Sequence, residues 1–315
     1  MIHYYIKKEG RLLELESVQP SCWINITPPF NTEELEEFAQ QFDIPLDFLT
    51  DSLDIDERSR YEREEDVRLI LLNTPLLNVA EDVSDTIYIT VPIGIILTPE
   101  NVITITSYTN PVLERFLEQR VKHFDPSDEV LFVLQIMEQA VYGFLNGLKK
   151  LNLKRNLIEE ELYHSSRNKE LKDLLSIEKS LVYFVNALRA NELLQMKMKR
   201  TDFLQLREDE DKVDLFEDII IDNGQALEMA NVYSNILSGT MDAYASIISN
   251  NLNVTIHRLT LVTIFLAVPT LLASVYGMNI PLPLQENNFA LYLIIGLSVV
   301  LSLLMAWYFQ RKRYF

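Results

Sequence analysis

The residues with the clearest chemical potential form the tetrapeptide Tyr276-Gly277-Met278-Asn279, which closes a long apolar stretch near the C-terminus. Gly277 lets the backbone leave a helix without a steric penalty, and Asn279 then places an uncharged carbonyl oxygen at the end of that stretch. In a ring of identical chains such oxygens would converge on the symmetry axis. Gly and Asn are also common at ordinary helix C-termini, which is the alternative reading of the tetrapeptide.

A stripe of polar, small and apolar side chains precedes this tetrapeptide. Steps of three, four and seven residues place the stripe on one face of a helix. Its members, reading backwards, are Thr270, Ala267, Thr263, Leu259, Ile256, Asn253, Ser249 and Asp242. Polar side chains in an apolar segment are expected to face water or a partner helix, and apolar ones could form a constriction that closes by dewetting. For Thr263 and Thr270 the alternative is a hydrogen bond to an upstream carbonyl of their own helix.

A second chemically distinctive group consists of acids that crowd one region of the chain. Residues 208–211 are all acidic, and Asp211, Asp214, Asp218 and Asp222 share a helical face. Like charges at this spacing repel one another, so one interpretation is a solvated surface. The other is a site for a hard divalent cation shared between subunits, because such cations prefer oxygen ligands.

Other kinds of chemistry find little support in this sequence. The four histidines are scattered, Cys22 is the only cysteine, and no nucleophile elbow, zinc-protease motif or Gly-rich phosphate loop occurs. We therefore expect neither an enzyme nor an organic cofactor, and we expect Cys22 to be a buried apolar residue. The 28 basic and 46 acidic residues give a net charge of −18, which argues against a nucleic-acid partner.

Two C-terminal segments, about 259–276 and 289–309, are long and apolar enough to cross a lipid bilayer. Trp307-Tyr308 and then the basic tail 310–315 follow the second segment, His257-Arg258 precede the first, and the loop 277–288 has no Lys or Arg. This charge bias predicts two spans in the plasma (inner) membrane with both termini cytoplasmic. The basic tail is either an anchor or a cationic collar around an inner pore mouth. The N-terminus lacks the pattern of a signal peptide.

The rest of the chain predicts a water-facing body in two parts. Residues 1–125 mix strand and helix patterns and predict a layered α/β/α cytoplasmic domain. Strands are expected at 22–27, 67–73, 86–98 and 102–108, and helices at 31–42 and 45–53.

From about residue 126 the pattern becomes helical. We expect a helical hairpin over 126–201, with a break near 164–168, and a stalk helix over 202–276 that continues into the first span. A helix of that length cannot be buried within one small domain, so we expect an oligomer with partner helices from other copies.

Three segments together resemble the CorA family of magnesium channels. The first is the GMN tripeptide 277–279 between two terminal spans, the second is WINIT at 23–27, and the third is LTDSL at 49–53 followed by Glu57-Arg58. The resemblance covers essentially the whole chain. It implies a CorA-like homopentameric funnel in which Gly277, Met278 and Asn279 form the selectivity filter and bind Mg²⁺ through its water shell.

The resemblance also implies roles for single residues. Leu259 would form a pore constriction and Asp242 an acidic ring at its inner end, while Ala267 stands where the family often has Met. Asp51 and Asp218 would bind intracellular Mg²⁺ across the subunit interface and hold the closed state. Thr50 replaces an acid that the family often carries beside the first of these.

The resulting hypothesis is a self-associating channel in the lipid bilayer that mediates passive influx of hydrated Mg²⁺, with Co²⁺ or Ni²⁺ as further cations. Intracellular Mg²⁺ at the acidic sites between subunits would gate it. Two alternatives stay open. One is a zinc transporter on the same scaffold, because residues 280–286 depart from the acidic loop common in the family. The other is a membrane-anchored coiled-coil scaffold that conducts nothing, against which the polar stripe argues.

Overall fold

The computed structural model describes residues 1–78, 86–162, 168–278 and 289–311. The chain divides into two compact units, Met1–Met241 and Asp242–Phe315. The strands are β1 (Ile2–Lys8), β2 (Arg11–Leu15), β3 (Trp23–Ile26), β4 (Arg60–Glu64), β5 (Val67–Leu77), β6 (Tyr88–Leu97) and β7 (Val102–Ile105). The helices are α1 (Thr32–Gln41), α2 (Leu46–Asp51), α3 (Pro111–Leu117), α4 (Glu129–Leu162), α5 (Asn168–Thr201), α6 (Glu210–Tyr276) and α7 (Ala290–Arg311).

The first unit is built on a seven-stranded sheet with the order β2-β1-β3-β7-β6-β5-β4. Only the pairing of β3 with β7 is parallel, and the other neighbours are antiparallel. β3, β5, β6 and β7 match the four apolar runs that predict strands. The sequence reading missed β1, β2 and β4, whose residues are mostly exposed or half-buried and whose sequences are rich in charge, so they lack the apolar pattern of an interior strand.

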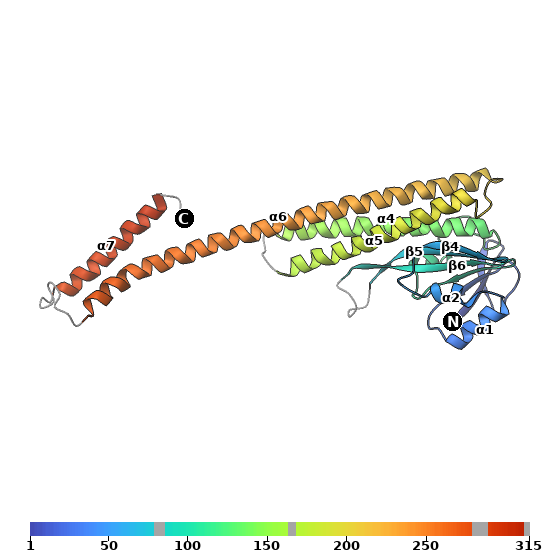
Figure 1. The fold of residues 1–315 in the computed structure, drawn as a ribbon, viewed down its shortest axis with the longest axis horizontal. Coiled ribbons are helices and arrows are strands. Elements are labelled where there is room, and N and C mark those ends of the chain that lie inside the picture. The colour runs from blue at the N-terminus through green and yellow to red at the C-terminus, as the bar shows by residue number, and fades with distance from the viewer. Residues whose placement is uncertain (79–85, 163–167, 279–288, 312–315) are drawn as a thin grey trace. The chain divides into compact units, whose positions relative to one another are not determined.

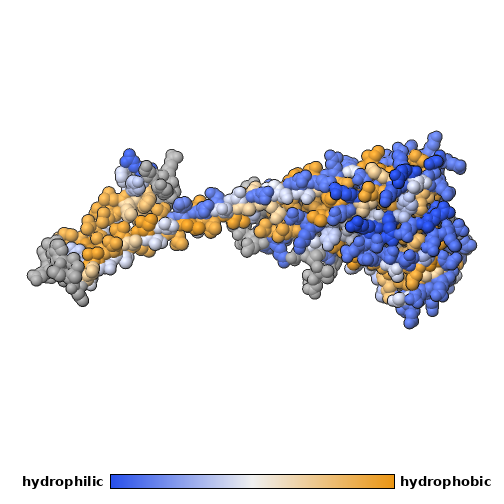
Figure 2. Space-filling view, viewed as in Figure 1, coloured by the Kyte–Doolittle hydropathy of each residue, from blue (hydrophilic) through white to orange (hydrophobic). Residues whose placement is uncertain are grey.

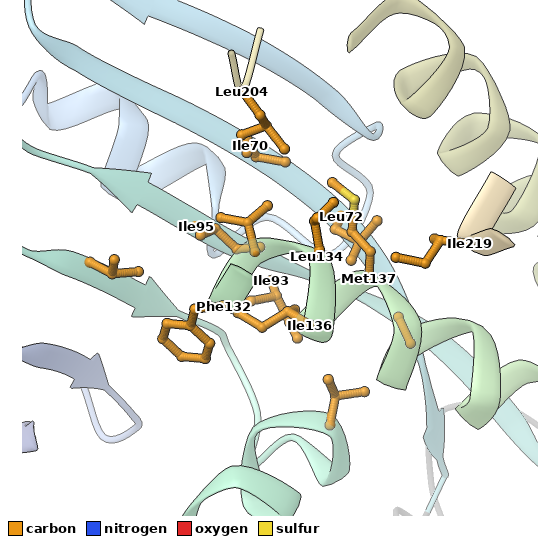
Figure 3. Close-up of a cluster of buried hydrophobic side chains, with 14 of the residues drawn as sticks. Ile70, Leu72, Ile93, Ile95, Phe132, Leu134, Ile136, Met137, Leu204 and Ile219 are labelled. Atoms are coloured by element: carbon orange, nitrogen blue, oxygen red, sulfur yellow. The ribbon is translucent and has the colours of Figure 1, made fainter. Parts of the chain in front are cut away.

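Helices cover both faces of this sheet (Figure 1). On one face Phe38 of α1 and Phe48 of α2 pack on Leu69 and Leu71 of β5. On the other face, side chains of α3, α4, α5 and α6 pack on Ile70, Leu72 and their neighbours. Figure 3 shows part of this second cluster, where Phe132, Leu134, Ile136 and Met137 of α4 approach Ile93 and Ile95 of β6. Successive residues of a strand point to opposite faces, and the three-layer α/β/α arrangement predicted from the sequence is confirmed.

Three long helices follow the sheet. α4 ends at Leu162 and α5 begins at Asn168. The break that the sequence predicts near 164–168 falls largely on residues 163–167, which lie outside the described part of the chain. α6 begins only at Glu210, and residues 202–209 form its connection to α5 rather than its first turns. Phe216 and Ile219 of α6 belong to the apolar cluster on the sheet, which ties the start of the long helix to the first unit.

Asn191 attaches α5 to the sheet. Its Nδ2 donates to the Asn73 carbonyl oxygen at 2.8 Å, and its Oδ1 accepts from the Asn73 N–H at 3.1 Å and from the Ser59 hydroxyl at 2.7 Å. β4 begins at Arg60, which pairs with Leu71, so Asn73 lies beyond the end of that strand. The side-chain amide of Asn191 therefore supplies the hydrogen bonds that a neighbouring strand would otherwise make.

We expect Asn191→Ala to lower the free energy of unfolding by about 2 kcal/mol, because the buried Asn73 carbonyl oxygen loses its donor and the Asn73 N–H keeps only its bond of 3.2 Å to the Ser59 hydroxyl. Asn191 is only 1% exposed, so water cannot easily replace the lost amide. Thermal melting of the detergent-solubilised chain, followed by circular dichroism, measures the change. Asn186→Ala, at an exposed position of the same helix, is the matched control, and equal melting of the two variants would contradict the prediction.

Candidate functional site

Three of the described helices are long and apolar enough to cross a membrane, judged by length and composition. In α4 the apolar window is 56% buried within the protein, whereas the windows in α6 and α7 are 6% and 0% buried. The apolar side chains of α4 serve the core of the first unit. Those of α7 and of the C-terminal part of α6 have no such cover, and Figure 2 shows a hydrophobic surface over this part of the chain. These two helices are the candidates for spanning a bilayer.

Within the second unit, one face of α6 lies against α7. Leu261 is buried, and the rings of Phe265 and Phe309 meet edge to face with centroids 6.1 Å apart. Near the end of α6 the two helices line an open apolar groove of about 980 Å³, which includes Phe265, Pro269 and residues of α7. This face of α6 is therefore occupied by the chain itself.

The stripe predicted from the sequence lies on the opposite face of α6. Consecutive residues of a helix are about 100° apart, so Thr263 points roughly 200° from the buried Leu261. Asp242, Ser249, Asn253, Ile256, Leu259, Thr263, Ala267 and Thr270 are all exposed in the single chain. The structure thus keeps these residues together on a face that α7 does not cover, and a single chain encloses no pore with them.

The hydroxyl groups of Thr263 and Thr270 donate hydrogen bonds to upstream carbonyl oxygens of their own helix, as the alternative interpretation of the sequence predicts. Thr263 Oγ1 donates to the Leu259 carbonyl oxygen at 2.9 Å, and Thr270 Oγ1 donates to the Leu266 carbonyl oxygen at 2.7 Å. Each hydroxyl proton is therefore used inside the helix, and each oxygen keeps a free lone pair. Along this face the two threonines present hydrogen-bond acceptors to whatever lies beside them.

The helix ends at the predicted tetrapeptide. Tyr276 is the last residue of α6, and the Gly277 N–H donates to the Ala273 carbonyl oxygen at 2.9 Å. A Cβ atom at position 277 would lie 3.3 Å from that oxygen, closer than most side chains allow. Met278 is half exposed. Asn279, the predicted filter residue, lies outside the described part of the chain.

Asp51, the first predicted ligand of a regulatory cation, lies at the end of α2 and is held by an arginine. Arg60 Nη2 donates to Asp51 Oδ2 at 2.8 Å. The same guanidinium donates through Nη1 to Glu57 Oε1 and through Nε to Glu62 Oε1, both at 2.5 Å. Burial lowers the pKa of Arg60, but the hydrogen bonds and charges of these carboxylates outweigh it and hold the pKa above its usual value.

Asp218, the second predicted ligand, is exposed on α6. Its helix packs through Phe216 and Ile219 on one face of the sheet, whereas α2, which carries Asp51, packs on the other face. The structure therefore does not bring the two carboxylates together within one chain. In the described part of a single chain, no group of three His, Cys, Asp or Glu residues is arranged to hold a metal ion.

Some of the surrounding acids have cationic partners. Lys199 Nζ lies 2.6 Å from Glu217 Oε1, and Lys212 Nζ contacts the carboxylates of Asp128 and Asp209 at 2.9 and 3.4 Å. For these acids the structure favours an ordinary surface role.

The sequence reading missed Arg60. It belongs to the charged segment RYERE at 60–64, which carries no apolar pattern and no recognisable site motif. The three carboxylates that it binds converge because a turn connects α2 to β4, and the pattern of this segment in the sequence does not show that it brings these side chains to Arg60.

Comparison with known proteins places this geometry in a family. The model for the family described as "CorA-like Mg2+ transporter protein" matches residues 19–312. The cobalt/magnesium transport protein CorA of Methanocaldococcus jannaschii is 27% identical over 320 residues, which cover 98% of this chain and 97% of that protein. The protein of the same name from Thermotoga maritima is 25% identical, with 98% of this chain and 89% of that protein covered.

A solved structure agrees over the full length. The complete structure of the CorA magnesium transporter from Methanocaldococcus jannaschii superposes with a TM-score of 0.80 at 25% identity, covering 100% of this chain and 99% of that chain. The mixed α/β unit, the long helices and the two apolar C-terminal helices are thus all shared with a full-length relative. The chain belongs to the family of CorA-like Mg²⁺ transporter proteins.

Proposed function

We propose that this protein is a homo-oligomeric channel, with five subunits, through which hydrated Mg²⁺ enters the cell passively. The observation that carries the proposal is the exposed stripe of α6, which lies opposite the face that α7 covers and contains polar side chains within an otherwise apolar helix. Polar groups on such a helix are stable when they face water or one another. A ring of these helices would place the stripes around a central water-filled path.

The chemistry of the stripe suits a cation that keeps its water. Mg²⁺ gives up its water ligands reluctantly, and those waters point their hydrogen atoms outward. Thr263 and Thr270 use their own protons within the helix and so offer acceptor oxygens to such waters. The amide of Asn253 adds another neutral oxygen, and Asn279 would do the same at the external entrance.

The same stripe argues against a pathway built for bare zinc. Zn²⁺ is held in proteins mainly by sulfur and imidazole ligands, and the stripe contains neither Cys nor His. Passive flow needs no fuel, because a divalent cation crossing an inside-negative membrane gains about 4.6 kcal/mol per 100 mV. We place both termini in the cytoplasm of a cell whose plasma membrane holds the two spans.

Regulation would come from the first unit. Asp51 and Asp218 lie on opposite faces of one subunit's sheet, so a cation could bridge them only between neighbouring subunits. Two carboxylates are a suitable set for Mg²⁺. When internal Mg²⁺ is scarce the acids of adjacent subunits repel, and the ring of subunits loosens.

Flux into vesicles tests the proposed activity. We expect the purified chain in phosphatidylethanolamine and phosphatidylglycerol vesicles to admit Mg²⁺ down an inside-negative potential, and to admit Mg²⁺ in preference to Zn²⁺. Absence of Mg²⁺ flux would contradict a channel and favour a scaffold. Flux of Zn²⁺ alone would favour the zinc alternative.

Cysteine accessibility tests which face of α6 lines the path. The native Cys22 is fully buried, so the chain carries little reactive background. We expect a small charged thiol reagent to block Mg²⁺ flux through Thr263→Cys and to leave flux through Val262→Cys unchanged. Val262 is 51% exposed in the single chain but points about a quarter of a turn away from the stripe. Equal sensitivity of the two variants would contradict the assigned face.

A further inference from the structure

Arg60 is the point at which three acidic side chains of the first unit meet. All three of its guanidinium nitrogens are engaged, Nη2 by Asp51, Nη1 by Glu57 and Nε by Glu62. One positive charge therefore faces three carboxylates, and the group keeps a net negative charge. The planar fork of arginine can hold several carboxylates at once, which a lysine ammonium cannot do with the same geometry.

Asp51 makes the longest of the three contacts with Arg60, and it is the partner that lies furthest from Arg60 along the chain. Its contact is 2.8 Å long, against 2.5 Å for Glu57 and Glu62, and its side chain, which is 38% exposed, can be reached from solvent. If Arg60 left Asp51, the other two acids would still pair with it, so no unpaired buried charge would result. Space for the movement exists, because Arg60 lines a cleft of about 1250 Å³ between the sheet and α5.

We propose that Arg60 is a resident competitor for the regulatory cation at Asp51. The inference rests on the proposed regulatory role of Asp51 and Asp218. While divalent cations are scarce, the guanidinium occupies Asp51 Oδ2. A divalent cation that bridges Asp51 to a neighbouring subunit must first displace it. Arg60 thereby sets the Mg²⁺ concentration at which the subunits become linked.

The direction of this effect follows from the competition. A cation binds only to those molecules in which Asp51 is free, so its apparent affinity is reduced by the fraction that Arg60 occupies. Arg60 also places a positive charge beside the incoming cation, which weakens binding further. A purely supporting role for Arg60, in which it orients Asp51 for the metal, predicts the opposite change when Arg60 is removed.

The test measures the Mg²⁺ concentration that half-protects the full-length protein, in detergent, from limited digestion by chymotrypsin. We expect Arg60→Gln to lower this midpoint by about threefold or more, which is the change in affinity that the loss of a partly exposed ion pair produces. Arg58→Gln is the matched control. It removes the same charge from an exposed position two residues away, and in the described part of the chain no ion pair links Arg58 to Asp51. We expect its midpoint to stay at the wild-type value.

Arg60→Lys keeps the positive charge and still tests the proposal if Arg60→Gln fails to fold. We expect its midpoint to lie between those of Arg60→Gln and the wild type. A midpoint that rises in either variant at Arg60, or that falls equally in Arg58→Gln, overturns the proposal. Asp51→Asn distinguishes failure of the regulatory site at Asp51 from failure of the competition by Arg60. If Asp51→Asn leaves the midpoint unchanged, the regulatory site itself fails and the competition fails with it. If Asp51→Asn raises the midpoint while both Arg60 variants match the wild type, only the competition fails.

Discussion

Replacing Asn279 by alanine is expected to lower Mg²⁺ uptake into vesicles by at least tenfold, because each subunit would lose one hydrogen bond to the hydrated cation. A net hydrogen bond contributes about 1 kcal/mol, and the loss repeats in every copy around the ring. About 1.4 kcal/mol corresponds to a factor of ten, so the combined loss at the entrance is large. The amide matters here because it is neutral and can hold a water-bound cation without stripping it.

The control for this experiment comes from the same loop. Asn288→Ala removes the same kind of side chain from the segment that joins the two apolar helices, and we expect its uptake to match that of the wild type. Both variants must assemble as the wild type does, which size-exclusion chromatography with light scattering measures. Uptake by Asn279→Ala at the wild-type rate would remove the basis for assigning the filter to residues 277–279.

Neutralising both proposed regulatory acids, as Asp51→Ala with Asp218→Ala, is expected to abolish the inhibition of uptake by Mg²⁺ on the cytoplasmic side. The cation would lose its carboxylate ligands on both sides of the subunit interface. Uptake should then continue at internal concentrations that stop the wild-type channel. Vesicles loaded with graded Mg²⁺ and assayed for influx of external Mg²⁺ measure the effect.

A second double variant separates this site from general loss of negative charge. Asp56→Ala with Glu208→Ala removes two exposed acids from nearby parts of the same unit. It changes the net charge by the same amount. We expect it to retain inhibition at the wild-type concentration. Unchanged inhibition in the variant of Asp51 and Asp218 would rule out this pair as the sensor.

The fold of the first unit was predictable where one strand or helix carries its own pattern. The apolar runs at β3, β5, β6 and β7 are buried on both faces of the sheet, and such runs are visible in a sequence. The hairpin of β1 and β2 and the short β4 were not found. The hairpin ends the sheet on one side, with β2 as its edge strand, and β4 is the edge strand on the other. Only part of each of these strands is buried and polar residues are tolerated there, so no apolar run marks them.

The candidate site on α6 also has one feature that the sequence predicts and one that it does not. The stripe on α6 could be predicted because helical spacing alone decides which residues share a face. Whether α7 would cover that face or the opposite one could not be predicted, because both faces of α6 are apolar enough to pack. The structure shows which face is covered, through the buried Leu261 and the ring contact of Phe265 with Phe309.

The sequence alone therefore determined the two apolar segments, the stripe, the closing tetrapeptide and the acidic character of the body, because length, periodicity and composition are local properties of a chain. Only the tertiary structure decided that the stripe is the uncovered face of α6, that Arg60 holds Asp51, and that Asp51 and Asp218 lie on opposite faces of one sheet. Each of these depends on how separate helices and strands come together in three dimensions, and a linear pattern does not specify that arrangement.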